Sequence, residues 1–257
     1  MEETLKKQLF ALCVLALFVA GALGVSGGDA RAAEKYIAAG DCYWPPMEYL
    51  SENKEPQGYT FALLREMAKL GGFEVEIQNV AWDGILGGIA MDKYDIVASS
   101  CTITPERQQQ FDFSDPYLEV TQAVILPAGK SISSLADLKG KAVGGQVATT
   151  GIFVMREANV GAELREYDDV GLAIEALVTG RLDAVVCDDP VAMYYVNMRK
   201  DYAGKLNISY KHDTRESFGF AVKKGRTDLV EKLNASLKMV KEAGIDKKLA
   251  ETWFGGK

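Results

Sequence analysis

The residues best suited to bind a small charged ligand lie in one segment, SSCTITPERQQQFDFSD at residues 99–115. This segment follows a short apolar run at residues 95–98, whose pattern predicts a buried strand. Hydroxyl groups and backbone amides stand where that strand ends, on Ser99, Ser100 and Thr102. Groups of this kind can hydrogen-bond a polar ligand at the end of a strand.

A short helix is predicted directly after these hydroxyls. Thr104 has the type and position of a helix N-cap, and Pro105 suits the first helical position. We therefore expect the guanidinium of Arg107 near the carboxyl end of the preceding strand. Its fixed fork of donors can grip a carboxylate in two places, so the segment predicts a carboxylate site. The plain alternative is a surface arginine that opens an ordinary helix.

Polar residues also stand at the ends of other predicted strands. The apolar runs end in Asp41, in Ser99-Ser100, in Gln146 and in Cys187-Asp188. In open α/β sheets, ligands bind beyond the carboxyl ends of the strands. Thr149 and Thr150 precede a predicted helix, and the free amides at a helix start favour an anion. These patterns together predict a ligand site at the strand ends.

Three of the candidate residues have ordinary structural explanations that stay open. Trp44 precedes Pro45-Pro46 and Trp82 precedes Asp83-Gly84. Turn-forming neighbours favour a place at the rim of a site, but both tryptophans could belong to the core. Asp188 precedes Asp189-Pro190, so it could simply cap the next helix.

The pattern S-x-T-I-T-x-E-R followed by F-D-F-S-D-P-Y resembles the signature of the family 3 extracellular solute-binding proteins. These proteins capture amino acids for bacterial ABC importers. The likeness continues through residues 41–49, 58–59 and 82–84, and it covers nearly the whole chain after residue 32. It implies the α/β, two-lobed type II fold of periplasmic binding proteins. Each lobe would be an open, mostly parallel sheet flanked by helices, with a two-strand hinge.

The resemblance also implies how an amino acid would be held at its α-carbon. Arg107 would clamp the α-carboxylate, with hydrogen bonds from Thr102 and from the amide and hydroxyl of Thr150. Asp188 and the carbonyl of Ser100 would hold the α-ammonium group. The amino acid and the membrane subunits of an ABC importer are the expected partners.

The side-chain end of the site is implied by the same resemblance. Trp44 and Trp82 would flank the ligand's side chain, and Asp41 with Ser99 would reach its far end. Two aromatic faces closed by a carboxylate suit a cation. This predicts lysine, arginine, ornithine or histidine, with glutamine as the alternative. Thr149 belongs to the expected lining, and Gln146 departs from relatives that carry Lys or Leu, so its role stays open.

The sequence offers little for catalysis. Its one histidine, His212, lies in a loop-like Lys-His-Asp stretch, and no His/Cys/carboxylate cluster has metal-ligand spacing. We therefore predict no catalytic residue, no metal and no cofactor. The alternative is an enzyme on the same scaffold, as in relatives that dehydrate cyclohexadienyl acids. The chain has both Arg107 and Asp188, which together recognise a zwitterion, and this favours a binding protein over an enzyme.

The first half of the chain alternates strand and helix patterns. Strands are predicted at 36–39, 73–77 and 95–98, and helices at 59–70 and from residue 85 to residue 90. Gly71-Gly72 ends the first helix. This order predicts an open, mostly parallel sheet covered by helices.

A second set follows residue 117. Strands are predicted at 123–126, 142–144, 184–186 and 218–222, and helices at 133–139, 150–157, 170–179, 190–199 and 227–243. The resemblance implies that the chain returns to the first lobe at Phe218. We therefore expect a first lobe at 33–117, a second at 118–217 and a return segment at 218–257. Segments near 117–121 and 217–220 would form the hinge.

Residues 1–32 have the pattern of a secretory signal peptide. Lys6-Lys7 precede an apolar run from Leu9 to Val25, and Ala30-Arg31-Ala32 surrounds a cleavage point. A retained membrane anchor is the weaker alternative, because the run carries glycines. We expect a soluble, exported, periplasmic protein.

The net charge of the chain is −7, and it stays −7 without residues 1–32, which hold three basic and three acidic residues. An acidic surface without basic runs argues against binding nucleic acid or anionic membranes. We expect a monomer.

The three cysteines that remain after residue 32 are Cys42, Cys101 and Cys187. We expect them to be buried, although a Cys42–Cys101 disulfide stays open.

Overall fold

The structure is a computed structural model that describes residues 33–255. The predicted signal peptide at residues 1–32 lies outside the described residues, as do residues 256 and 257.

The first lobe is built on a five-stranded sheet in the order β5-β1-β6-β13-β7. Its strands are β1 (Glu34–Gly40), β5 (Phe73–Asn79), β6 (Ile96–Val97), β7 (Phe111–Phe113) and β13 (Ala221–Lys223). Strand β1 pairs in parallel with β5 and β6, whereas β13 pairs antiparallel with β6 and β7. The last part of the chain thus returns to the sheet that the first part began.

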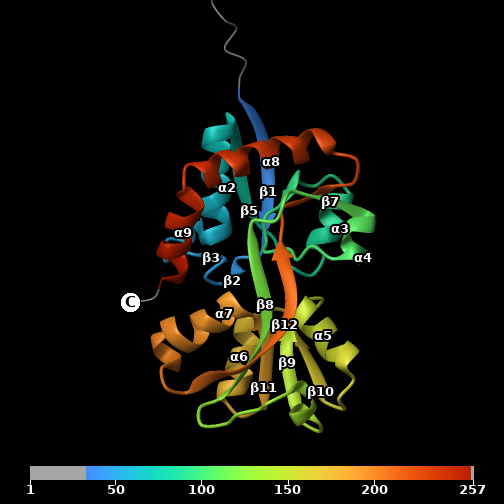
Figure 1. Cartoon of the computed structure of the whole chain (residues 1–257), viewed down its shortest axis with the longest axis vertical. Helices are drawn as coiled ribbons and strands as arrows, with labels where there is room; N and C mark the ends of the chain where they lie inside the picture. The colour runs from blue at the N-terminus through green and yellow to red at the C-terminus, as the bar shows by residue number, and fades with distance from the viewer. Residues whose placement is uncertain (1–32, 256–257) are drawn as a thin grey trace, which may run out of the picture. The chain divides into compact units, whose positions relative to one another are not determined.

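Helices and a small sheet complete this lobe (Figure 1). The helices are α2 (Tyr59–Gly71), α3 (Ile85–Ala90), α4 (Pro105–Gln110), α8 (Thr227–Glu242) and α9 (Ile245–Phe254). The small sheet holds β2 (Tyr43–Trp44), β3 (Glu48–Leu50) and β4 (Pro56–Gln57). Helix α2 buries an apolar face that includes Phe61, Leu64 and Met67, as its helical spacing predicts.

The second lobe has a five-stranded sheet in the order β10-β9-β11-β8-β12. Its strands are β8 (Leu118–Pro127), β9 (Ala142–Gln146), β10 (Glu163–Tyr167), β11 (Ala184–Asp188) and β12 (Leu206–Phe218). Strands β9, β10 and β11 run parallel, and β8 and β12 run antiparallel to their neighbours. The helices are α5 (Thr150–Ala158), α6 (Val170–Val178) and α7 (Asp189–Met193).

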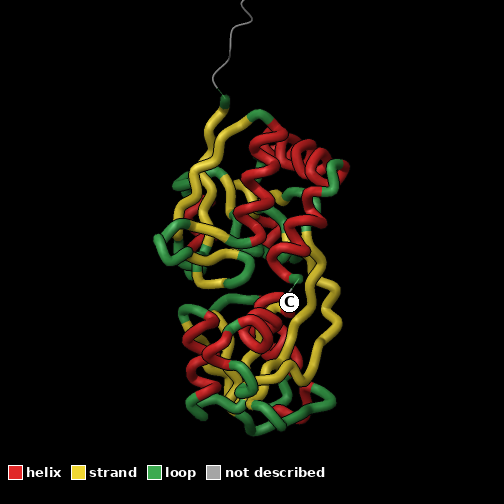
Figure 2. Tube along the Cα trace, turned by 90° about the vertical axis from the view of Figure 1, so that its left-hand side faces the viewer, coloured by secondary structure: helices red, strands yellow, loops and turns green. Residues whose placement is uncertain are grey.

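Strands β8 and β12 lie side by side and lead from one lobe to the other (Figures 1 and 2). Where they enter the first lobe, the N–H of Tyr117 donates to the carbonyl of Phe218 (3.0 Å), and Thr102 forms a β-bridge with Phe218. The lobe boundaries that we drew after residues 117 and 217 stay predictions, although β8 and β12 have their ends beside them.

Several predicted elements differ in detail. The helix at 133–139 is only a 3-10 turn, Leu135–Leu138, and the helix at 190–199 is α7 followed by a π-helical turn, Tyr194–Met198. The strand at 218–222 divides, since β12 ends at Phe218 and β13 begins at Ala221. Pairing with two different sheets requires this break. His212 lies in β12 and not in a loop, because pairing with β8 holds a polar, alternating segment extended.

The three cysteines of the described residues are buried, free thiols, so Cys42 and Cys101 form no disulfide. None of the helices within residues 33–255 has the length and apolar character that crossing a membrane requires. In the same part of the chain, no group of three or more His, Cys, Asp or Glu side chains is arranged to hold a metal ion.

Candidate functional site

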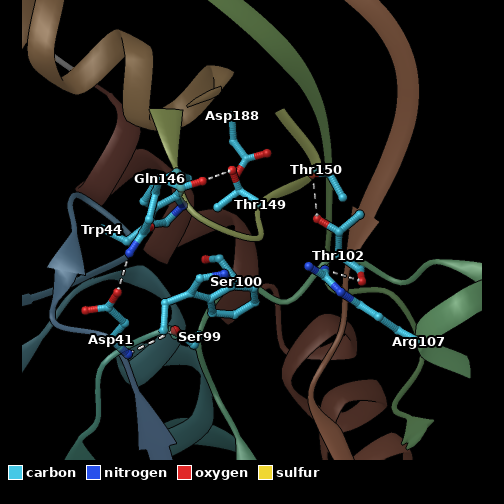
Figure 3. A pocket seen from close by; sticks show the side chains of 11 residues that line it. Asp41, Trp44, Ser99, Ser100, Thr102, Arg107, Gln146, Thr149, Thr150 and Asp188 are labelled. Carbon is cyan, nitrogen blue, oxygen red and sulfur yellow. Dashed lines mark hydrogen bonds between the residues drawn. The ribbon is translucent and has the colours of Figure 1, made fainter. Parts of the chain in front are cut away.

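All eleven residues that the sequence singled out line one pocket (Figure 3). The first lobe contributes Asp41, Trp44, Trp82, Ser99, Ser100, Thr102 and Arg107, and the second lobe contributes Gln146, Thr149, Thr150 and Asp188. Most of them follow the ends of strands β1, β6, β9 and β11. The sheets therefore bring together residues up to 147 positions apart, from Asp41 to Asp188.

Arg107 reaches the pocket from a helix that begins as predicted. The hydroxyl of Thr104 accepts from the N–H of Arg107 (3.2 Å), and Pro105 occupies the first turn. The guanidinium is buried, and its Nη1 donates to the carbonyl of Thr102 (2.9 Å). Within the described residues it has no carboxylate partner, so it retains donors for an anion.

Trp82 lies beneath this guanidinium, with the central carbon of Arg107 5.2 Å from its ring centroid. One face of Trp82 thus supports Arg107 through a cation–π contact. The Nε1 of Trp82 is buried without a hydrogen-bond partner in the described part of the chain. This N–H is an unused donor at the pocket.

Ser100 holds an unusual backbone conformation at the end of β6, with φ of 43°. A non-glycine residue in this region is strained and persists only where its surroundings fix it. The Ser100 hydroxyl donates to the carboxyl group of Glu48 (2.8 and 3.1 Å), which is fully buried. Burial raises the pKa of Glu48 well above its ordinary value. Glu48 therefore fixes the turn that carries Ser100.

Asp41 occupies the end of the pocket formed by β1. Its N–H donates to the Ser99 hydroxyl (2.9 Å), and its carboxylate accepts from the N–H of Tyr43 (3.2 Å) and from Nε2 of Gln146 (2.7 Å). Burial raises the pKa of Asp41, and the charge of Asp169 adds to this effect. A cation beside Asp41 would offset both costs.

Asp188 lies at the N-terminus of α7, but its side chain makes no capping hydrogen bond. Its carboxylate instead accepts from Nε2 of Gln122 (2.7 Å). Burial, and secondarily the charge of Glu216, raise the pKa of Asp188 to about 8. The capping explanation that the sequence left open is thus not the role of this side chain.

Thr149 and Thr150 begin α5. The Thr149 hydroxyl donates to the carbonyl of Gln146 (2.7 Å), and the Thr150 hydroxyl donates to Glu216 (2.8 Å). Neither hydroxyl is therefore free to donate to a ligand in this arrangement, although the amides at the helix start are.

Three polar contacts join the lobes across the pocket. Gln146 donates to Asp41 (2.7 Å), Arg107 Nη2 donates to the carbonyl of Ala148 (3.3 Å), and the hydroxyls of Thr102 and Thr150 lie 3.4 Å apart. The pocket is therefore closed by direct contacts between its walls. The amide of Gln146 bridges the lobes and also donates to the carbonyl of Asp168 (2.9 Å), while its role in ligand binding stays a prediction.

Sequence reasoning missed the residues behind the pocket, namely Glu48, Gln122 and Glu216. Gln122 could have been noticed, because it is a polar residue directly before the apolar run at 123–126. Glu216 carries no such signal, since its strand is polar along most of its length.

Comparison with known proteins agrees with this geometry. Residues 36–256 match the model of the bacterial extracellular solute-binding proteins, family 3. The chain belongs to this family. The probable histidine-binding protein of Neisseria gonorrhoeae is 34% identical over 258 residues, covering 97% of this chain and 96% of the relative.

Two solved structures support the same fold. An ancestral arginine-binding protein bound to glutamine is 36% identical, with a TM-score of 0.81 over 86% of this chain and 98% of that one. An ancestral amino acid-binding protein, a precursor of cyclohexadienyl dehydratase, is 33% identical, with a TM-score of 0.79 over 86% of this chain and 95% of that one. The predicted two-lobed α/β fold and the predicted family are confirmed.

Proposed function

We propose that this family member is the periplasmic receptor of an ABC importer for a basic L-amino acid, with arginine, lysine, ornithine and histidine as the candidates. The observation that carries the proposal is the pocket's arrangement of charge. The guanidinium of Arg107, which has no carboxylate partner among residues 33–255, lies in one lobe and the carboxyl group of Asp188 lies in the other. A third ionisable group, Asp41, closes the far end.

The α-carboxylate would bind Arg107 and the amides at the start of α5. A guanidinium grips a carboxylate through two parallel hydrogen bonds, and the free amides of a helix start add to the attraction. The α-ammonium group would bind Asp188 and the carbonyl of Ser100. A zwitterion spanning these groups would hold both lobes together.

The side chain would extend past Trp44 and Trp82 toward Asp41. A basic side chain supplies the positive charge that the buried carboxylate of Asp41 lacks within the described residues. The relatives support this choice, since one is named a probable histidine-binding protein and another an arginine-binding protein.

Glutamine is a second candidate. Asp41 already accepts a hydrogen bond from an amide, that of Gln146, so it could accept one from the amide of a bound glutamine. The ancestral arginine-binding protein was likewise found with glutamine bound.

The discriminating variant is Asp41→Asn, which keeps the shape of the side chain and removes its charge. We expect a thermal-shift screen of the wild type to rank a basic amino acid first. In Asp41→Asn, calorimetry should show a loss of arginine affinity of about 1.5–3 kcal/mol, the usual value for a hydrogen bond to a charged group, and a smaller loss for glutamine. Asp201→Asn, an exposed aspartate distant in sequence, is the control. Glutamate or leucine at the top of the screen would reject the proposal, as would turnover of a cyclohexadienyl acid.

A further inference from the structure

A hydrogen-bonded cluster lies directly behind the pocket and joins both hinge strands to it. Its centre is Gln122 on β8, whose Nε2 lies 2.7 Å from Asp188 Oδ1, 3.0 Å from Glu216 Oε2 and 3.1 Å from Thr150 Oγ1. Glu216 belongs to β12 and also accepts from the Thr150 hydroxyl at 2.8 Å. The cluster therefore contains two residues that line the pocket, Asp188 and Thr150, and two that do not.

A bulge in β12 brings Glu216 into this cluster. The strand pairs His212 with Gln122 and then Glu216 with Val120, so three residues of β12, 213–215, lie opposite the single residue Thr121 of β8. Within the bulge, Arg215 has φ of 49°, a strained value for a residue with a side chain. Bulges re-aim side chains near binding sites, and this one directs a carboxylate toward the back of the pocket.

The number of hydrogens that the cluster's polar groups can donate decides which group donates to which. An amide nitrogen has two hydrogens, and the two shortest contacts of Gln122 Nε2 go to the carboxylates of Asp188 and Glu216. The Thr150 hydroxyl gives its one hydrogen to Glu216. Thr150 Oγ1 therefore has no hydrogen left to donate, and toward a ligand in the pocket it can act only as an acceptor, for example of an ammonium group.

We propose that Glu216 is a positioning residue for the ligand's α-ammonium group, acting through Gln122 on Asp188 and directly on the Thr150 hydroxyl. This inference rests on the proposed function, since it assumes that the ligand carries an ammonium group at Asp188. Because Glu216 and Gln122 lie on the two strands that join the lobes, the same contacts couple the ammonium site to the hinge.

The charges around Asp188 explain why an ammonium group would be needed there. Glu216 from β12, Asp189 from α7 and Glu48 from β3 are acidic neighbours, and Arg107 from α4 opposes them. Burial and the charge of Glu216 together raise the pKa of Asp188 to about 8, so Asp188 holds its proton at neutral pH in the ligand-free protein. An arriving ammonium group favours the ionised form of Asp188, and the proton leaves to the solvent.

The test is calorimetry with L-arginine on the wild type and Glu216→Gln, at about pH 6.5 and pH 8.5 and in two buffers of different ionisation enthalpy. In the wild type, binding near pH 6.5 should release close to one proton, and affinity should rise toward pH 8.5. In Glu216→Gln the proton release near pH 6.5 should be smaller than in the wild type, because the Glu216 charge that adds to the effect of burial on the Asp188 pKa is gone. At pH 8.5 the variant should bind about tenfold more weakly, the loss of one charge-assisted hydrogen bond.

Two further variants make the comparison specific. Glu119→Gln removes the same charge from an exposed position on β8, opposite Ser217, and should match the wild type in both proton release and affinity. Glu216→Asp keeps the charge and should retain most of the proton release. A wild-type proton count in Glu216→Gln would overturn the inference while leaving the proposed function intact.

A ligand-free measurement separates the two proposals. Without ligand, the melting temperature of the wild type should fall as the pH rises from about 6 to 9, since Asp188 must then ionise in a buried site and beside Glu216. Glu216→Gln should show a shallower fall, and Glu119→Gln should not. Equal slopes in all three proteins would overturn the inference. If the wild type gives no heat with arginine, lysine or histidine, the proposed function fails, and the melting slopes alone decide whether Glu216 acts on Asp188.

Discussion

Among single residues, Arg107 gives the clearest prediction for ligand affinity. Its guanidinium is buried, stacked on Trp82 and free of any carboxylate within the described part of the chain. We expect Arg107→Ala to weaken binding of a basic amino acid by about 2–5 kcal/mol, because the ligand's carboxylate loses its charged partner while it stays desolvated. Arg107→Lys should recover only part of this, since an ammonium group lacks the planar fork.

Calorimetry with arginine measures both variants. Arg165→Ala, at an exposed arginine on β10, is the control and should bind as the wild type does. Near-native affinity in Arg107→Ala would place the carboxylate elsewhere.

The buried carboxyl group of Glu48 leads to a prediction about how the free energy of unfolding depends on pH. Burial raises the pKa of Glu48 in the folded protein well above its ordinary value. The protonated Glu48 therefore stabilises the fold fully at a pH below its pKa in the unfolded chain. This stabilisation is lost as the pH rises through its pKa in the folded protein. Glu48→Gln, which resembles the protonated acid, should therefore show a free energy of unfolding that falls less steeply with rising pH. Glu48→Ala should cost about 2–5 kcal/mol, because it opens a cavity and leaves the Ser100 hydroxyl without its acceptor.

Urea unfolding of the ligand-free protein between about pH 5 and pH 9 measures this effect. Glu52→Gln, at an exposed glutamate, controls for the loss of one charge. The role assigned to Glu48 fails if both variants show the same dependence on pH.

At the scale of an element, the start of helix α5 depends on close packing against Gln122. A Cβ at Gly151 would lie 2.7 Å from Gln122 Oε1 and 3.2 Å from the side chain of Val186. Gly151→Ala should therefore displace an amide that other hydrogen bonds hold in place, at a cost in stability of about 1–3 kcal/mol, the usual range for overpacking. Arginine affinity should fall with it, since Gln122 holds Asp188.

Gly87→Ala is the matched control for this substitution. Gly87 lies in helix α3, where an added Cβ meets no atom within 4 Å. This variant should be unchanged or more stable by about 0.5–1 kcal/mol, because alanine favours the helix. Thermal melts and calorimetry compare the two. Equal behaviour of the two variants would show that the packing at Gly151 is unimportant.

At the scale of the whole molecule, the pocket is complete only when both lobes contribute. Arg107 and Asp41 belong to one lobe, and Asp188 and Thr150 belong to the other. A ligand that contacts both sets stabilises the closed form relative to any open form, by as much as its affinities for the two forms differ.

Small-angle scattering with and without arginine should therefore show a smaller radius of gyration with the ligand. Gln146→Ala removes a direct contact between the lobes and should make the ligand-free protein more open, whereas Gln108→Ala, at an exposed position, should not. Unchanged scattering at saturating arginine would contradict closure as the binding mechanism.

Much of the fold, and many of the residues that line the pocket, could be predicted from the sequence. Helix α2 and strand β1 follow from apolar spacing, and α4 follows from its cap and proline, because these signals act within a few residues. Asp41, Ser99, Ser100, Gln146 and Asp188 could be chosen because strand ends in open sheets converge at one edge. The choice of Trp44 and Trp82, and the ligand contact of Thr102, depended on the resemblance to the family. Their roles in ligand binding stay predictions.

The contacts that hold the pocket residues in place could not be predicted from the sequence. Glu48 and Ser100 are 52 positions apart in sequence, and Gln122 and Asp188, like Glu216 and Thr150, are 66 apart, so no local pattern pairs them. The same is true of the division of residues 218–222 between two strands, which depends on which sheet each residue meets. Hydrogen bonds of buried polar groups are satisfied by whatever the fold brings near, so these contacts depend on the assembled lobes and cannot be read from the spacing of residues along the chain.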